Sequence, residues 1–330
     1  MAEDLIRIRN LKTYFFQGKG LLSKLFGQGL KVVHAVDGVN LSIKKGSTFG
    51  LVGESGCGKS TLGKTIFRLV EPLEGEILFE GRDVVKMDQK NLREFRQKAQ
   101  IIFQDHFGCL NPRMTAGQII AEPLIMCRGK QESQKSIEQE VAELLRAVNL
   151  DPDAAVKFPN EFSGGQARRI GVARAIALNP MFIMADEPTS GLDISTAATI
   201  LNLMQDLQDK LDITYLWVSH NLTQVKYMSD DMAVMYLGKV VEMGRTNEVF
   251  NKMAHPYTQA LIPAVPQVSS KQKKQAILLK GEIPSPINPP SGCYFRTRCP
   301  QVFKRCEKEE PLLLDLGGGH FCACHLYDGH

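Results

Sequence analysis

A phosphate-binding loop is the feature of this sequence that most constrains its fold. The stretch Gly53–Thr61 reads Gly-Glu-Ser-Gly-Cys-Gly-Lys-Ser-Thr and fits the pattern G-x-x-x-x-G-K-[ST]. The apolar segment 48–52 predicts a short strand before the loop, and residues 62–70 predict a helix after it. Strand, loop and helix in this order are typical of a nucleotide-binding α/β core.

The loop has the chemistry of a site for a polyphosphate. Its glycines let the backbone curl so that N–H groups point inward toward an anion. We expect Lys59 to reach the terminal phosphates and the Ser60 hydroxyl to ligate Mg²⁺. The helix that begins near Gly58 points its positive end at the same phosphates. The loop residues expected to bind nucleotide are Gly53, Ser55, Gly56, Cys57, Gly58, Lys59, Ser60 and Thr61.

Length and composition narrow the class of protein. A chain of 330 residues can bury a large core and has room for two domains. The formal net charge of +4 is too small to indicate a nucleic-acid partner. The sequence has no uncharged apolar run near 18 residues, and residues 1–7 do not resemble a signal peptide. We therefore expect a cytosolic protein with reduced cysteines.

Hydrophobic patterning predicts the secondary structure around the loop. Residues 5–16, 32–43 and 76–79 predict strands of an antiparallel sheet, and residues 17–31 predict a loop. From Gln89 to Leu178 the pattern is helical, with Ser163 as the N-cap of the last helix. Residues 181–185, 214–218 and 232–236 are apolar throughout and predict buried strands of a parallel sheet.

The strand predicted at 181–185 ends in two acids. Asp186 at the tip of a buried strand can hold Mg²⁺, and Glu187 can orient and deprotonate the attacking water. The alternative is that both acids only cap the strand. With a phosphate loop upstream, we expect the catalytic roles.

The turn Ser163-Gly164-Gly165-Gln166 opens a helix with two glycines and a hydroxyl. Its exposed N–H groups can bind another phosphate. One nucleotide does not need two such anion sites from one chain. We therefore expect this turn to serve the ATP of a second, facing subunit.

The joint order of these motifs resembles the ATPase subunit of an ABC transporter. The matching segments are Gly53–Thr61, Gln104, Ser163–Gln166, Asp186–Glu187, 190–193 and His220. The resemblance covers nearly the whole chain. It implies an α/β P-loop NTPase with a RecA-like parallel-sheet core, an antiparallel β subdomain and a helical subdomain.

The resemblance implies further site residues. Phe15 matches the aromatic that stacks on adenine, with Tyr14 and Phe16 as close rivals. Gln104 resembles the Q-loop glutamine, which senses Mg²⁺ and the membrane partner. Asp193 resembles the D-loop aspartate that contacts the opposite subunit, and His220 resembles the switch histidine that holds the γ-phosphate and the water.

A narrower resemblance is to the ATPases of dipeptide and oligopeptide importers, and within them to the second of the two ATPases. The segments that carry it are 103–105, 107–113, 255–258 and 284–293. It implies a nucleotide-binding domain over 1–254, with a helical subdomain about 90–178, and a Cys-rich C-terminal extension over 255–330. Departures at Phe162, Asn221 and Cys109 remove no phosphate-binding group.

The resemblance also implies partners and leaves alternatives open. We expect a paralogous ATPase subunit or a second copy, two transmembrane permease subunits, and an extracytoplasmic solute-binding protein, at the cytoplasmic face of the membrane. Related importers carry nickel, glutathione or oligosaccharides. A soluble ABC ATPase that acts on nucleic acid or ribosomes is an alternative of another class, which the single ATPase cassette and the absence of a basic stripe in the sequence disfavour.

Five of the eight cysteines lie in the last forty residues or so of the chain. The spacing Cys293-x5-Cys299-x6-Cys306-x17-Cys324 resembles the tail cysteines of this importer subfamily, which are associated with a 4Fe–4S cluster. Cys322 is a rival to Cys324. A structural Zn²⁺ site that also uses His320 or His325, and a set of free thiols, are the alternatives.

Overall fold

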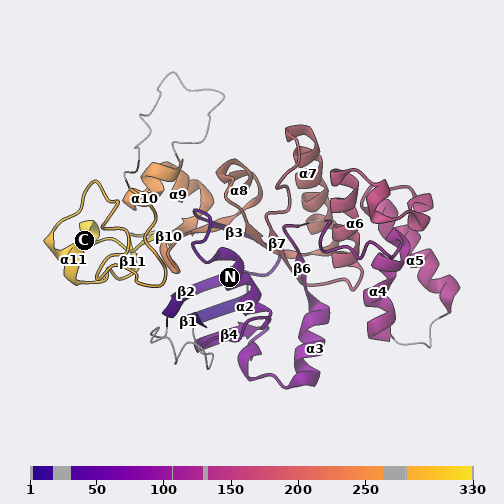
Figure 1. Ribbon diagram of the computed structural model, residues 1–330, viewed down its shortest axis with the longest axis horizontal. Helices are drawn as coiled ribbons and strands as arrows, with labels where there is room; N and C mark the ends of the chain where they lie inside the picture. Colours follow the sequence, from indigo (N-terminus) through magenta and orange to yellow (C-terminus); the bar gives the residue numbers. More distant parts are fainter. Residues whose placement is uncertain are drawn as a thin grey trace, which may run out of the picture. The chain divides into compact units, whose positions relative to one another are not determined.

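The strand that leads into the phosphate loop is β3 (Thr48–Val52), and all of its residues are buried. The computed structural model describes residues 3–17, 31–105, 107–128, 133–262, 279 and 281–328 (Figure 1). The chain divides into two compact units. The first comprises Met1–Lys44, Thr48–Lys86 and Val218–His330, and the second comprises Lys45–Ser47 and Met87–Trp217.

The first unit contains an antiparallel sheet in the order β2-β1-β4-β5. Its strands are β1 (Asp4–Gln17), β2 (Lys31–Lys44), β4 (Glu74–Phe79) and β5 (Arg82–Asp83). Ile6, Ile8 and Leu11 of β1 are buried, and the Thr13 hydroxyl lies 3.1 Å from that of Thr65 in the helix after the phosphate loop. The antiparallel subdomain is thus confirmed. The predicted loop 17–31 lies almost entirely outside the described residues.

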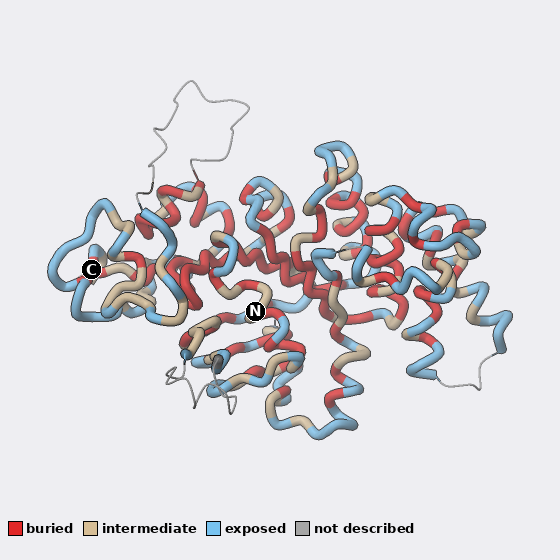
Figure 2. The backbone as a smooth tube through the Cα atoms, in the orientation of Figure 1, coloured by how far each residue is buried: buried red, intermediate tan, exposed pale blue. Residues whose placement is uncertain are grey.

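A second sheet in the first unit positions the phosphate loop. Within this unit its order is β11-β12-β10-β9-β3, with β3 parallel to β9 (Asp231–Tyr236) and β9 antiparallel to β10 (Lys239–Arg245). Figure 2 shows the buried residues of β3 and β9 in red. Helices α2 (Lys59–Ile66), α8 (Leu222–Met228), α9 (Thr246–Lys252) and α10 (Pro256–Leu261) also belong to the first unit.

Helix α2 is shorter than the sequence predicted. It was expected over 62–70, but it ends at Ile66, and Arg68 has a positive φ of 50°. A left-handed residue interrupts the i→i−4 ladder, so the helix cannot continue past it. The following residues lead the chain back toward β4.

The C-terminal residues are part of the first unit. They form α11 (Lys304–Lys308), β11 (Leu314–Asp315) and β12 (Phe321–Cys322), and β12 pairs with β10 through Glu242 opposite Cys322. Figure 1 shows this segment in yellow beside β10. The predicted separate Cys-rich extension is therefore not supported, because backbone pairing continues the sheet into the tail.

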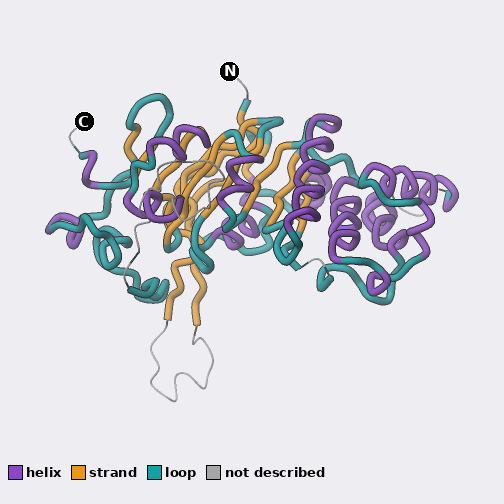
Figure 3. The backbone as a smooth tube through the Cα atoms, turned by 90° about the horizontal axis from the view of Figure 1, so that it is seen from above, coloured by secondary structure: helices purple, strands orange, loops and turns teal. Residues whose placement is uncertain are grey.

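The second unit contains strands in the order β8-β7-β6, covered by helices. The strands are β6 (Ala99–Ile102), β7 (Phe182–Asp186) and β8 (Thr214–Val218), of which β6 and β7 are parallel. The helices are α3 (Gln89–Lys98), α4 (Ala116–Arg128), α5 (Gln134–Ala147), α6 (Gly164–Ile176) and α7 (Ile194–Leu211). Figure 3 shows α4, α5 and α6 as a group of purple helices, and they contact one another.

The prediction of an uninterrupted helical region over 89–178 was wrong at β6. These four residues follow α3 directly and pair with β7, from Ala99 opposite Phe182 to Ile102 opposite Ala185. A four-residue apolar run fits a buried strand and a helix equally well by periodicity. Pairing with β7 decides in favour of the strand.

The described residues also form short 3₁₀ helices. They are η1 (Val84–Lys86), η3 (Pro152–Val156), η4 (Pro159–Glu161) and η6 (His325–Tyr327). Across the described ranges, every helix is too short or too polar to span a bilayer.

Candidate nucleotide-binding site

The phosphate loop has the backbone that its glycines allow. Gly53, Gly56 and Gly58 have φ values of 154°, 80° and 108°. A Cβ on Gly53 would lie 2.2 Å from the Met235 carbonyl oxygen, and one on Gly58 would lie 2.0 Å from that of Ala35. A Cβ on Gly56 would meet none of the described atoms within 4 Å. The loop is thus packed on one side and open on the other, as a cradle for a ligand requires.

Lys59 closes the loop on itself. Its ammonium group donates to the carbonyl oxygens of Gly53 at 2.8 Å and Glu54 at 3.0 Å, and lies 3.7 Å from the Cys57 sulfur. Only 6% of the Lys59 residue surface is exposed. Burial raises the pKa of the Cys57 thiol, and the nearby Lys59 charge opposes that rise. Lys59 is therefore positioned inside the loop, beside the backbone groups that would face a phosphate.

Three aromatic residues at the end of β1 were rivals for the adenine position. The Tyr14 hydroxyl donates to Asp37 at 2.6 Å, and its ring centroid lies 4.3 Å from that of His34. Tyr14 is thereby engaged within the protein. Phe15 and Phe16 are each 40% exposed and point to opposite faces of the strand. Phe15 remains the predicted stacking residue.

His220 follows β8 and is exposed. The residue before it, Ser219, donates its backbone N–H to the Leu51 carbonyl oxygen of β3 at 3.1 Å. Asn221, the next residue, caps α8 by accepting from the backbone N–H of Thr223 at 3.0 Å. The departure at Asn221 thus provides a helix cap, and the residue before His220 is bonded to the strand that leads into the phosphate loop.

In the second unit, the two predicted acids lie at the end of β7. Asp186 is the last residue of the strand and is 5% exposed. Glu187, the next residue, adopts a left-handed φ of 48°. Its Oε2 accepts a 2.7 Å hydrogen bond from Nε2 of Gln104, which follows β6. The structure thus brings Gln104 and Glu187 together.

Arg168 of α6 organises the surroundings of this pair and was missed in the sequence. Its guanidinium donates to the carbonyl oxygens of Phe103 at 2.8 Å, Gln104 at 3.0 Å and Ser190 at 3.3 Å. The residue is 1% exposed, and burial lowers its pKa below the ordinary value. Sequence reasoning assigned Arg168 only to a helix, because the carbonyl groups it binds lie far away along the chain.

Ser163 and Gln166 of the turn that opens α6 are exposed, and their side chains cap the turn. The Ser163 hydroxyl accepts from the Gln166 N–H at 3.3 Å, and Oε1 of Gln166 accepts from the Ser163 N–H at 3.0 Å. The predicted N-cap at Ser163 is confirmed. A Cβ on Gly165 would lie 2.5 Å from Cγ2 of Thr196 in α7, so this glycine permits the close approach of two helices.

Asp193 is the N-cap of α7. Its carboxylate accepts from the Thr196 backbone N–H at 2.9 Å and from the Thr196 hydroxyl at 2.6 Å. Hydrogen bonds from Ser195 and Thr196 hold the pKa of Asp193 well below its usual range. The residue is exposed, so it combines a capping role with a position where another subunit can contact it.

Comparisons with known proteins now identify the family. A family profile described as ABC transporter matches residues 36–190, and one described as oligopeptide/dipeptide transporter, C-terminal region, matches residues 241–306. The oligopeptide transport ATP-binding protein AppF of Bacillus subtilis is 46% identical over 98% of this chain and 98% of its own length. The chain belongs to the ATP-binding proteins of oligopeptide/dipeptide ABC transporters.

Other relatives of this family agree. The dipeptide transport ATP-binding protein DppF of Escherichia coli is 40% identical over 99% of this chain and 96% of its own length. Among solved structures, the ATP-binding cassette MJ0796 bound to ADP and phosphate superimposes with a TM-score of 0.64 at 28% identity. That match covers 73% of this chain and 98% of the cassette. Family membership makes this chain an ATPase whose hydrolysis is coupled to transport.

The tail cysteines lie in the first unit, where the Cys293 N–H donates to the Cys306 carbonyl oxygen at 2.9 Å and Cys322 lies opposite Glu242 of β10. Burial raises the pKa of Cys293 to about 11, and the nearby thiols of Cys306, Cys324 and Cys299 raise it further. The pKa of Cys324 rises to about 11 through burial and then through Cys299 and Cys306. Burial also raises the pKa of Cys322, and the nearby groups of Glu242, Cys324 and Cys293 raise it further.

The tail cysteines do not form a binding site for a single metal ion in the part of the chain that the structure describes. Within the described part of the chain, no group of three or more His, Cys, Asp or Glu side chains is arranged to hold a metal ion. The His320 ring shares a 2.7 Å hydrogen bond with the Glu242 carboxylate. The His325 ring shares another, also of 2.7 Å, with the Asp328 carboxylate. The side-chain geometry therefore supports neither the predicted iron–sulfur cluster nor the zinc alternative, and the cluster stays a prediction.

Proposed function

We propose that this protein hydrolyses ATP to power the import of dipeptides or oligopeptides through an ABC transporter. The observation that carries the proposal is the 40–46% identity to transport ATP-binding proteins over nearly the full length of the chain. A C-terminal region of the oligopeptide/dipeptide type supports the cargo class. In this proposal the permease and solute-binding subunits contact the cargo. The test therefore also distinguishes peptides from related cargoes such as nickel, glutathione or oligosaccharides.

The phosphate loop is the proposed site for the ATP phosphates. The open side of the loop at Gly56 and the buried ammonium of Lys59 support this role. When nucleotide binds, Lys59 exchanges the carbonyl oxygens of Gly53 and Glu54 for phosphate oxygens, which carry more negative charge. The Ser60 hydroxyl would ligate Mg²⁺, Phe15 would stack on adenine, and His220 would hold the γ-phosphate.

Residues of the second unit are proposed to act on the metal and the attacking water. Asp186 and Gln104 would act at Mg²⁺, which neutralises charge on the phosphates when it is bound. Glu187 would hold and accept a proton from water. Its hydrogen bond from Gln104 supports this assignment, because the bond orients the carboxylate at the end of β7.

We propose that two such ATPase subunits close around two ATP molecules. The turn Ser163–Gln166 would bind the nucleotide of the opposite subunit, and Asp193 would contact that subunit. The exposure of Ser163 and Asp193 supports this arrangement. The opposite subunit is a paralogue, with this chain as the second ATPase, or another copy. Two permease subunits would dock near residues 104–113 at the cytoplasmic face of the membrane and receive cargo from a solute-binding protein.

We also propose that residues 1–254 act as the nucleotide-binding domain, with a helical subdomain about 90–178, and that residues 255–330 form a C-terminal region specific to this importer class. The family profile over 241–306 supports the second assignment. The contacts of the tail with β10 make the two regions one structural unit while their functions differ.

The test of the proposal is ATP-driven peptide uptake. The protein is co-expressed with the permease and ATPase genes adjacent to its own and reconstituted in vesicles with the cognate solute-binding protein. We expect ATP-dependent accumulation of peptide and its loss in Lys59→Ala, which should also lose nucleotide affinity. Accumulation of nickel, glutathione or oligosaccharide instead would change the cargo class. Co-purification with RNA and no uptake would contradict the transport function.

For the tail, we propose that Cys293, Cys299, Cys306 and Cys324 ligate a 4Fe–4S cluster. Each thiolate of such a cluster binds a different iron, so the sulfur ligands lie further apart than around a single ion. The spacing of these four cysteines and the 2.9 Å hydrogen bond from the Cys293 N–H to the Cys306 carbonyl oxygen support the set. We expect iron, acid-labile sulfide and a broad absorbance near 400 nm (roughly the thiolate–iron charge-transfer region). Cys299→Ser should lose them and Cys322→Ser should retain them.

A further inference from the structure

The C-terminal region contacts the phosphate loop at Glu54. Arg298 donates from Nη1 to Oε2 of Glu54 at 2.6 Å and from Nη2 to Oε1 at 3.0 Å. This is a two-point ion pair between residues 244 positions apart. The Arg298 side chain is 7% exposed and that of Glu54 is 26% exposed, so solvent screens the pair only in part. A tail residue thus fixes the side chain of the second residue of the phosphate loop.

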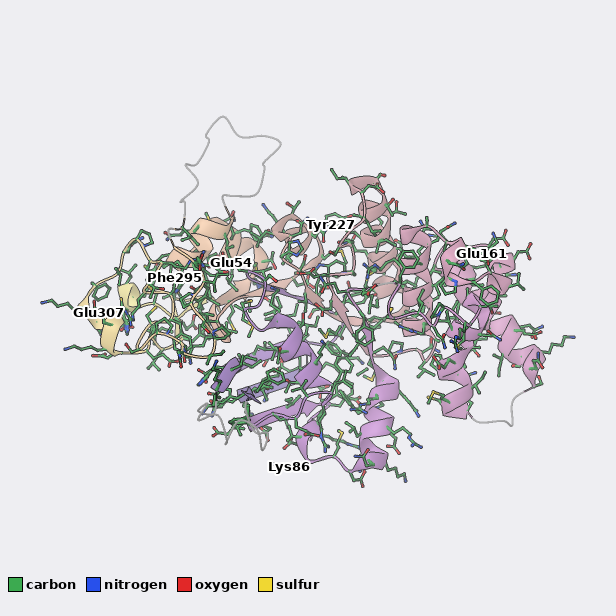
Figure 4. All side chains as sticks on the ribbon, in the orientation of Figure 1. Glu54, Lys86, Glu161, Tyr227, Phe295 and Glu307 are labelled. Atoms are coloured by element: carbon green, nitrogen blue, oxygen red, sulfur yellow. The ribbon has the colours of Figure 1, made fainter. Side chains whose placement is uncertain are left out.

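The main chain of Glu54 is fixed as well. Its N–H donates to the Tyr257 hydroxyl at 2.9 Å, and its carbonyl oxygen accepts from Lys59 at 3.0 Å. Tyr257 is fully buried against Phe295 and Tyr236, with ring centroids 5.4 Å and 4.8 Å away. Figure 4 shows Glu54 and Phe295 next to each other. The backbone conformation of the loop therefore depends on an aromatic cluster that includes a tail residue.

The ion pair also affects the charge around the loop. Glu54 places a carboxylate in a segment that receives a polyphosphate, and like charges at short range repel. The guanidinium of Arg298 neutralises this carboxylate, and it also lies 5.9 Å from the centroid of the Tyr236 ring. Arginine is suited to this task because its planar fork binds a carboxylate through two hydrogen bonds. The contact orients the loop and removes a repulsive charge.

Arg298 is itself held in a tight turn of the tail. Its N–H donates to the Phe295 carbonyl oxygen at 3.0 Å, and the Cys293 N–H donates to the Cys306 carbonyl oxygen at 2.9 Å. Cys293 starts this turn and Cys299 follows Arg298 directly. Any change that loosens the turn will therefore move the guanidinium that binds Glu54.

We propose that Arg298 is a positioning residue for the phosphate loop, through which the C-terminal region sets the affinity for nucleotide. The inference rests on the proposed function because it assigns regulation of the same nucleotide site. It adds a role for residues that lie outside the ATP-binding motifs. It also predicts that the effect of Arg298 passes through Glu54 and disappears when Glu54 no longer carries a charge.

The test compares variants by ATP affinity and by the split between KM and kcat. Arg298→Gln should raise both the Kd for a fluorescent ATP analogue and the KM for ATP by about fivefold to tenfold, because a charge-assisted contact is lost. Its kcat should stay within about twofold, since Glu187 and Gln104 are untouched. Arg298→Lys should recover part of the affinity through charge alone. In a Glu54→Gln background, Arg298→Gln should leave the Kd and the KM for ATP unchanged.

Tyr294→Phe is the matched control. It removes another contact of the tail, the 3.0 Å hydrogen bond from the Tyr294 hydroxyl to Asp37 of β2, and leaves the contacts of Glu54 with Arg298 and Tyr257 in place. We expect a lower melting temperature with an unchanged KM. Equal KM increases in Tyr294→Phe and Arg298→Gln would reduce Arg298 to a structural role and overturn the proposal. Wild-type affinity in both Arg298→Gln and Arg298→Lys would do the same.

These outcomes are separate from failure of the proposed function. If the wild-type protein binds no ATP analogue, the nucleotide site itself is wrong and the proposal falls with it. If the wild-type protein binds and hydrolyses ATP while Arg298→Gln behaves identically, only the coupling to the tail is wrong.

Discussion

Nε2 of Gln104 donates a 2.7 Å hydrogen bond to Oε2 of Glu187. The two residues are 83 positions apart, and each follows a strand of the same parallel pair. The carboxyl ends of parallel strands meet at one edge of a sheet, where α/β proteins bind ligands. The bond thus joins the proposed sensor of the membrane partner to the proposed catalytic base.

We expect Glu187→Gln to retain ATP binding and to lose turnover by about 10²-fold to 10⁴-fold, the typical contribution of a general base. Glutamine can still accept the hydrogen bond from Gln104 but cannot accept a proton from water. Single-turnover hydrolysis and nucleotide binding are measured on the same preparation. Glu143→Gln, which changes an exposed carboxylate of α5, is the control and should keep wild-type turnover. Undiminished turnover in Glu187→Gln would remove this residue from the mechanism.

A second prediction concerns the packing under the exposed turn of α6. Gly165→Ala should lower the free energy of unfolding by about 1–3 kcal/mol, because the new Cβ would lie 2.5 Å from Cγ2 of Thr196. Thr196→Ser removes this methyl group and keeps the hydroxyl that donates to Asp193. The double variant should therefore regain most of the lost stability, as measured by urea unfolding. An additive loss in the double variant would show that the clash is not the cause.

Arg168 provides a third prediction. Arg168→Met should lower the free energy of unfolding by about 2 kcal/mol, because the carbonyl oxygens of Phe103 and Gln104 lose a buried donor. Hydrogen exchange should increase in the segments around Gln104 and Ser190. Arg169→Met is a neighbouring control, since that guanidinium donates to Asn149 instead. Equal exchange around Gln104 in the two variants would contradict the role of Arg168.

The sequence predicted the parts of this protein whose signals are local. The phosphate loop, its entering strand and the cap at Ser163 each depend on residues close together in the chain, so pattern alone identified them. The strand β6 was missed because four apolar residues between helices carry no distinguishing period. Its identity depends on pairing with β7.

The contacts that organise the candidate site were beyond sequence reasoning for the same reason. Arg168 binds carbonyl groups about 65 positions away, and Arg298 binds Glu54 across most of the chain. Backbone carbonyl groups have no sequence signature, and a surface-type residue such as Glu54 gives no hint of its partner. The roles of Gln104, Asp193 and His220 entered only through the family resemblance. Their positions follow from packing that residue type alone does not specify.

The last prediction concerns pH and the buried histidine at the start of α10. His255 is 1% exposed, and burial lowers its pKa to about 4, although Glu242 acts in the opposite direction. Its Nδ1 accepts from the Tyr257 N–H at 3.0 Å, so the neutral ring caps the helix that presents Tyr257 to the phosphate loop. In the unfolded chain the histidine pKa is about 6.5. Between pH 6.5 and 4 the unfolded state therefore binds more protons, and stability falls as the pH falls.

The expected loss from His255 is about 3 kcal/mol at pH 4 and below, and none above pH 7. His255→Asn keeps a side-chain acceptor for the Tyr257 N–H and removes the titrating ring. The difference in unfolding free energy between the wild-type protein and His255→Asn, measured from pH 4 to 8, isolates this histidine from other titrating groups. We expect the variant to gain relative stability as the pH falls below 6.5. Parallel curves over the whole range would mean that His255 is not a source of acid sensitivity.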